Sequence, residues 1–132
     1  MKIRKLKIFC LNLLLACFIG LSAFASNGEK VTVEIDFGSG NHPKLKIETN
    51  WKEGLSALEA LQFVAEVKTH PVGQYVFVDE IDGVKGEPNQ SVWYYKINGA
   101  PAKKIAIDQP LESGDKITWI YKQDVCSPKE GE

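Results

Sequence analysis

The sequence predicts an α+β domain in which a mixed β-sheet packs on a single helix. Three observations predict this fold class: apolar and polar residues alternate over 31–37, a capped helix begins after Ser56, and two aromatic strands, 92–98 and 116–122, follow near the end. A period of two places one set of side chains on one face of a strand, and helical spacing does the same for a helix. Packing the strands against the helix buries both apolar faces.

The first two strands are expected to form a hairpin. Glycine and proline over 38–43 interrupt the first alternation, and Leu45 and Ile47 then alternate with charged residues to give the second strand. The first strand places all its apolar residues on one face, namely Val31, Val33, Ile35 and Phe37.

A helix is predicted over 57–68, and it is the only helix that we expect after the N-terminal segment. Ser56 and Glu59 have the spacing of a capping box, in which the serine hydroxyl and the glutamate carboxylate each accept from a backbone N–H at the helix start. Pro71 prevents continuation. The apolar face recurs at helical spacing, at Leu58, Leu61, Val64 and Ala65.

Four more strands are expected after the helix, over 74–81, 92–98, 104–107 and 116–122, with turns at Asn98-Gly99 and Ser113-Gly114. Two strands, one helix and then several strands is the element order of the β-grasp arrangement, in which a parallel pairing uses the helix as its crossover. Residues 123–132 lack hydrophobic periodicity, so a flexible tail is predicted there.

Residues 1–25 are predicted to be a secretory signal peptide. Basic residues precede an apolar run over 8–21, and Ala23-Phe24-Ala25 provides small residues before the cleavage point. A competing interpretation is lipoprotein processing at Cys17, which follows Leu14-Leu15-Ala16. We therefore expect an exported domain over 26–122 that is periplasmic, secreted or on the cell surface, with no transmembrane segment once the signal is removed.

The charge after residue 25 disfavours nucleic acid as a partner. This part of the chain has 12 basic and 17 acidic residues, a formal net charge of −5. Phosphate binding needs a basic surface. The same part contains one cysteine, Cys126, which is either a tail residue without a role or a thiol that pairs with another chain.

No spacing typical of a metal centre or a catalytic site is present. His42 and His70 both lie beside prolines, and Ser56 lacks the second glycine of a nucleophile elbow. Asp79 and Glu80 would point to opposite faces of a strand, so they are not expected to share a proton. The sequence therefore predicts a protein that is not an enzyme and that needs no metal or cofactor.

Five motifs follow one another along the chain, at Thr32–Gly38, Gly54–Leu61, Ile81–Gly83, Trp93–Gly99 and Leu111–Tyr121. Through these motifs the chain from Val31 to Lys122 resembles the transcobalamin-like C-terminal domain family (DUF4430 type), which includes the β-domain of cobalamin carriers. The resemblance implies a β-grasp-like fold and a corrinoid as candidate ligand. No region of the sequence resembles the larger helical domain of full-length carriers, so this domain alone is expected to bind such a ligand weakly.

The family's ligand contacts include its tryptophan-bearing strand, so the resemblance implies ligand-binding roles for Trp93, Tyr94, Tyr95 and Asn98. The residues themselves leave two interpretations open. The aromatic side chains either form core packed against the helix, or some of them form an exposed platform for a flat ligand.

Two functions follow from this sequence. The first is an exported, non-catalytic binding module for a small molecule such as a corrinoid, through the aromatic strand and adjacent loops. The alternative is a protein–protein interaction module at the cell surface or in the periplasm, which uses an exposed sheet edge or Cys126.

Overall fold

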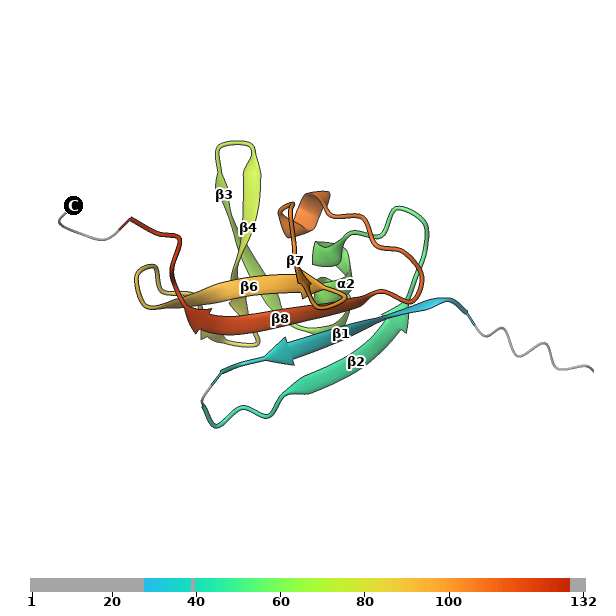
Figure 1. Cartoon of the computed structure of the whole chain (residues 1–132), viewed down its shortest axis with the longest axis horizontal. Helices are drawn as coiled ribbons and strands as arrows, with labels where there is room; N and C mark the ends of the chain where they lie inside the picture. Colours follow the sequence, from blue (N-terminus) through green and yellow to red (C-terminus); the bar gives the residue numbers. More distant parts are fainter. Residues whose placement is uncertain (1–27, 39, 129–132) are drawn as a thin grey trace, which may run out of the picture.

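The computed structural model describes residues 28–38 and 40–128, and these residues form two β-sheets and one α-helix (Figure 1). The five-stranded sheet has the order β2-β1-β8-β6-β7, and the smaller sheet has the order β3-β4-β5. The predicted α+β class is confirmed, with two sheets where we expected one. The elements are β1 (Lys30–Asp36), β2 (Leu45–Asn50), α2 (Ala57–Val64), β3 (Val67–Val72), β4 (Tyr75–Ile81), β5 (Val84–Lys85), β6 (Ser91–Ile97), β7 (Ala100–Pro101), the 3-10 helix η1 (Ala106–Asp108) and β8 (Lys116–Gln123).

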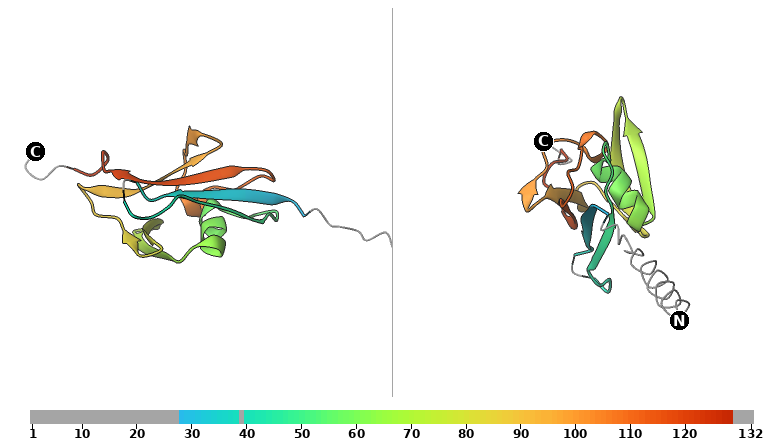
Figure 2. Two further views of the ribbon diagram at one scale, coloured as in Figure 1. Left: turned by 90° about the horizontal axis from the view of Figure 1, so that it is seen from below. Right: turned by 90° about the vertical axis from the view of Figure 1, so that its right-hand side faces the viewer.

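The first and last strands pair in parallel at the centre of the larger sheet. Strand β2 is antiparallel to β1, and β6 is antiparallel to β8. Parallel strands cannot be joined by a tight turn, so the chain between β1 and β8 has to cross over. This connection places α2 against one face of the larger sheet, as Figure 2 shows.

The core lies between that sheet face and α2. Val31, Val33 and Ile35 each expose 1% of their surface, which confirms the apolar face predicted from the alternation in β1. The buried residues of α2 are Ala57, Leu58, Ala60 and Leu61, and β8 contributes Ile117 and Trp119.

The predicted capping box is present at the start of α2. The backbone N–H of Glu59 donates to Ser56 Oγ at 3.1 Å, and the backbone N–H of Ser56 donates to Glu59 Oε2 at 3.0 Å. Both bonds satisfy N–H groups that have no partner within the helix. The Ser56 hydroxyl therefore has a structural role, as its spacing predicted.

Replacing Ser56 by alanine is expected to lower the free energy of unfolding by about 1 kcal/mol, because an N-cap hydroxyl is lost from a buried helix end. Equilibrium unfolding in urea measures this change. Ser113→Ala is the matched control, since Ser113 is exposed in a turn and its substitution should change the free energy by less than about 0.5 kcal/mol. Equal stabilities for the two variants would contradict the capping role.

The predicted helix boundary at Lys68 was wrong, because α2 ends at Val64 and β3 occupies Val67–Val72. In the sequence the helical spacing of apolar residues continues past Val64. A further helical turn would bury little apolar surface, because Phe63 in the last turn of α2 is already 61% exposed. The β-branched residues after it instead pair with β4. Pro71 is tolerated there because β3 is an edge strand.

The predicted strand over 104–107 was also wrong, because the structure has the short helix η1 at Ala106–Asp108. The segment packs on α2 instead of joining the sheet, with Ala106 6% exposed. Its continuation meets the start of the helix, where the backbone N–H of Ala57 donates to Gln109 O at 2.9 Å. The packing of this segment on α2 therefore explains why residues 104–107 do not form the strand that their alternation predicted.

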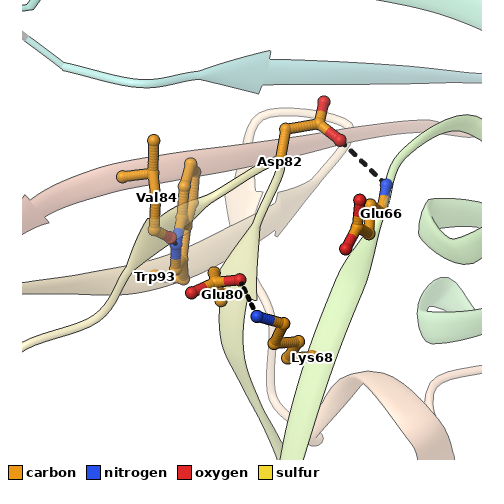
Figure 3. Close-up of polar contacts among 6 residues, drawn as sticks. All are labelled: Glu66, Lys68, Glu80, Asp82, Val84 and Trp93. Atoms are coloured by element: carbon orange, nitrogen blue, oxygen red, sulfur yellow. Dashed lines mark hydrogen bonds and ion pairs between the residues drawn. The ribbon is translucent and has the colours of Figure 1, made fainter.

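The hairpin formed by β3 and β4 projects away from the larger sheet (Figure 1). Figure 3 shows the contacts that fix its base: the backbone N–H of Glu66 donates to Asp82 Oδ1 at 2.8 Å, and Lys68 Nζ lies 2.8 Å from Glu80 Oε2. In the same region Trp93 Nε1 donates to the backbone oxygen of Val84 at 2.9 Å. The smaller sheet is thereby attached to β6.

The predicted signal peptide over 1–25, with Cys17, lies outside the described residues. Within the described ranges, no helix has the length and apolar character that crossing a bilayer requires. Gln123, where the flexible tail was predicted to begin, belongs to β8, and residues 124–128 follow it in the described chain.

Candidate ligand-binding cleft

A cleft of about 590 Å³ lies among the β3–β4 hairpin, β6 and the segment that leads into η1. Its lining is mainly apolar and aromatic, as is usual for small-molecule sites. The hairpin contributes His70, Val76, Phe77 and Val78, strand β6 contributes Val92, Trp93, Tyr94 and Tyr95, and the other side is formed by residues 102–106, Trp119 and residues of the C-terminal segment.

Trp93 lines the cleft and is also part of the hydrophobic core. Its side chain is 8% exposed, its Nε1 donates to Val84 O, and its ring meets Phe37 edge-on with 5.6 Å between centroids. A T-shaped contact and a satisfied N–H are typical of a core tryptophan. Trp93 therefore offers a ligand only part of its surface.

Tyr95 stacks on Trp119 within the cleft lining, with 4.9 Å between ring centroids and an angle of 24°. Its hydroxyl donates to the backbone oxygen of Lys104. Burial, with a smaller contribution from the charge of Asp108, raises the pKa of Tyr95 to about 12. Tyr95 therefore supplies a neutral aromatic wall with its hydroxyl already engaged.

Tyr94 lines the cleft where the C-terminal segment docks. Lys122 Nζ lies 4.8 Å from the centroid of its ring, its hydroxyl donates to Asp124 Oδ1 at 3.3 Å, and the backbone N–H of Val125 donates to its oxygen at 3.2 Å. Burial is the main cause that raises the pKa of Tyr94. These contacts leave Tyr94 bound to the segment that follows β8.

Asn98 lies away from the cleft, in the turn after β6. Its backbone has a φ of 50°, its Nδ2 donates to Asp115 Oδ1 at 2.8 Å, and its Oδ1 accepts from the backbone N–H of Lys116 at 2.9 Å. The side chain links two turns. The cleft thus brings together Trp93, Tyr94 and Tyr95 of the predicted site residues, and Asn98 is not among its lining.

The hairpin wall of the cleft was missed by sequence reasoning. Phe77 of β4 is 38% exposed and lines the cleft, together with Val76 and Val78. The sequence did contain a sign of this wall, because Phe77 and Tyr75 are aromatic residues at alternate positions of one strand. No neighbouring strand had been predicted for that strand, so its place beside a cleft could not be inferred. This wall of the cleft exists because the hairpin of β3 and β4 projects beside β6.

Asp124 anchors the chain after β8. Its carboxylate accepts from the backbone N–H groups of Asn89 at 2.8 Å, Cys126 at 2.9 Å and Ser127 at 3.1 Å. Hydrogen bonds from Ser127, then from Asn89 and Cys126, hold the pKa of this carboxyl well below its ordinary value. The beginning of the predicted flexible tail is therefore tied to the domain.

This arrangement predicts how docking of residues 124–128 depends on pH. Because the pKa of Asp124 is lowered in the folded protein, its contribution is complete above the ordinary carboxyl pKa of about 4 and is lost as the pH falls below it. Amide hydrogen exchange at Cys126 and Ser127 measures the docking. We expect Asp124→Ala to remove the protection already at pH 7 and Asp108→Ala to leave it intact, and equal protection in both variants would contradict the anchor.

Side chains that could together hold a metal ion do not converge in the described part of the chain. Among residues 28–38 and 40–128, no three His, Cys, Asp or Glu side chains form a cluster that could hold a metal ion. His70 Nδ1 lies 3.7 Å from Asp79 Oδ1, and the side chains of both are partly exposed. Cys126 is an exposed free thiol at the end of the cleft.

Several solved structures share this fold, including the following two. One is the crystal structure of a protein from Ruminococcus gnavus ATCC 29149 described as a "putative metal binding protein", with a TM-score of 0.58 and 17% identity over 73% of this chain and 98% of that one. The other is haptocorrin in complex with Cbi, with a TM-score of 0.59 and 10% identity over 71% of this chain and 25% of that one. At these identities the likeness concerns the fold alone.

A family match covers more than half of the sequence. No curated protein matches the chain significantly. Residues 54–123, from the turn before α2 to the end of β8, match the family described as "Domain of unknown function (DUF4430)". This match confirms the resemblance predicted from the motifs, and the chain therefore belongs to the DUF4430 family.

Proposed function

We propose that this domain is a non-catalytic binding module whose cleft holds a small molecule with a flat, largely apolar surface. The observation that carries this proposal is the aromatic lining of the 590 Å³ cleft between the projecting hairpin and β6. A corrinoid such as cobalamin is the first candidate, because haptocorrin, solved in complex with Cbi, shares the fold. The central parallel pair of β1 and β8 supports the finer assignment of this fold as β-grasp-like.

Two ionisable groups of the cleft, on Tyr95 and Asp124, support recognition and not catalysis. The Tyr95 hydroxyl is engaged by Lys104 O and has a raised pKa, whereas the Asp124 carboxylate is held by three backbone N–H groups. General acid–base catalysis needs a group that titrates near the working pH and reaches the substrate. Neither group meets both conditions.

Titration of the purified protein with cyanocobalamin tests the proposal. We expect quenching of tryptophan fluorescence and a change in the visible spectrum of the corrinoid, with a dissociation constant roughly in the micromolar to millimolar range because one domain covers one face of such a ligand. No change in either signal at millimolar concentration would exclude this corrinoid as the ligand.

Protein–protein interaction is the second candidate function. Strand β3 is a sheet edge, and the hairpin exposes Val72 by 52% and Tyr75 by 48%. An edge strand with exposed apolar side chains is suited to pairing with another chain. Recovery of no partner from the native cell envelope by affinity capture, with and without reductant, would count against this function.

We also propose that the protein is exported. The basic and apolar segments of residues 1–25 support cleavage before Ser26, with lipidation at Cys17 as the alternative. Mass spectrometry of the mature N-terminus distinguishes the two products. An intact Met1 on protein from its native cell would contradict export by either route.

A further inference from the structure

The indole N–H of Trp119 has no hydrogen-bond partner among the described residues. Trp119 lines the cleft and is 2% exposed, and its Nε1 is closed to solvent. The other two indoles differ, because Trp51 donates to Leu111 O at 2.8 Å and Trp93 to Val84 O at 2.9 Å. A buried donor without an acceptor is uncommon and unfavourable. A residue of the cleft lining therefore carries an unused donor.

The surroundings of Trp119 suit an acceptor that arrives with a ligand. The Tyr95 ring stacks on the indole, and the Tyr95 hydroxyl donates to Lys104 O, so neither group satisfies the Trp119 N–H. Lys103 and Lys104 both line the same cleft, and among the described residues that line it Asp124 alone carries a carboxylate. This lining favours an acceptor group that is polar or negatively charged.

We propose that the cleft recognises ligands that present a carbonyl or carboxylate oxygen to Trp119, which donates its N–H only in the complex. The inference rests on the proposed function, because it names the group by which a ligand of the same cleft is held. Since Nε1 is closed to solvent, the acceptor reaches it when a neighbouring side chain moves. A site with an unpaired donor discriminates against ligands that lack the acceptor.

Proton–nitrogen NMR of the three indole groups tests the inference on the wild-type protein. In the free protein, the Trp119 resonance is expected at the upfield position of an unbonded N–H. Acetate and acetamide, which each carry an acceptor oxygen and little else, are then titrated separately, and cyanocobalamin, which carries carboxamide groups, is the third probe. We expect at least one probe to move Trp119 downfield while Trp51 stays in place.

The outcomes separate this inference from the proposed corrinoid function. A Trp119 N–H that is already bonded in the free protein, or that moves with none of the three probes, overturns the inference. Binding of cyanocobalamin without a shift of Trp119 overturns it and leaves the binding function standing. A shift with acetate or acetamide, together with no binding of cyanocobalamin, supports the inference and removes the corrinoid.

A pair of variants adds an affinity measurement. Once both are shown to be folded, Trp119→Phe is expected to weaken binding of the best probe roughly tenfold, the effect of one ordinary hydrogen bond. Trp51→Phe is the matched control, because Trp51 lies outside the cleft lining and donates to Leu111 O. Equal affinities for the two folded variants would also overturn the inference.

Discussion

Replacing Trp93 by alanine is expected to destabilise the domain by about 3–5 kcal/mol, the usual effect of deleting a large aromatic side chain from a core. The indole is 8% exposed, meets Phe37 edge-on and donates to Val84 O, so its loss removes packing and leaves a backbone carbonyl of β5 without its partner. Because that carbonyl attaches the smaller sheet to β6, the hairpin should become more mobile too. Equilibrium unfolding in urea measures the change.

Trp93→Phe separates the packing of the ring from its hydrogen bond. The smaller ring still fills part of the site, so its destabilisation should be clearly less than that of the alanine variant. A loss of less than about 1 kcal/mol for Trp93→Ala would contradict a core role and favour the exposed-platform interpretation of this side chain.

Replacing Phe77 by alanine is expected to weaken binding of cyanocobalamin about tenfold, equivalent to about 1.4 kcal/mol. The ring is 38% exposed and forms the hairpin wall of the cleft, so a ligand would bury surface that is in contact with water in the free protein. Stability should change much less than for Trp93→Ala, because the ring is already partly hydrated.

Tyr75→Ala is the matched control for the hairpin wall. Tyr75 lies on the same strand with 48% exposure, but it is not among the residues that line the cleft. Its substitution should leave the affinity within about twofold of the wild type. If Tyr75→Ala weakened binding as much as Phe77→Ala, the ligand would contact the hairpin beyond the cleft and would not be confined to the cleft.

Features that depend on local sequence could be predicted. The alternation in β1 and the capping box at Ser56 were both found in the structure, because each depends on residues within a few positions of one another. The turn at Asn98 likewise has the positive φ that Asn-Gly indicates.

Features that depend on tertiary contacts could not be predicted. The end of α2 at Val64 is decided by how little the next turn would bury and by the pairing of β3 with β4, and η1 is decided by contact with α2. The cleft depends on the projection of a hairpin beside β6, which no local pattern encodes. The tryptophan strand was identified as a candidate through the family resemblance, whereas Phe77 was not.

Mapping the binding site of cyanocobalamin by backbone amide NMR tests the central claim most directly. The account predicts that chemical shifts change in one contiguous set, at residues 76–78 of β4, 92–95 of β6 and 102–106, the walls of the cleft. Residues of β2, on the far edge of the larger sheet, should be unaffected. Changes confined to β2 or to hairpin residues outside the cleft lining, or no changes at millimolar ligand, would contradict the account.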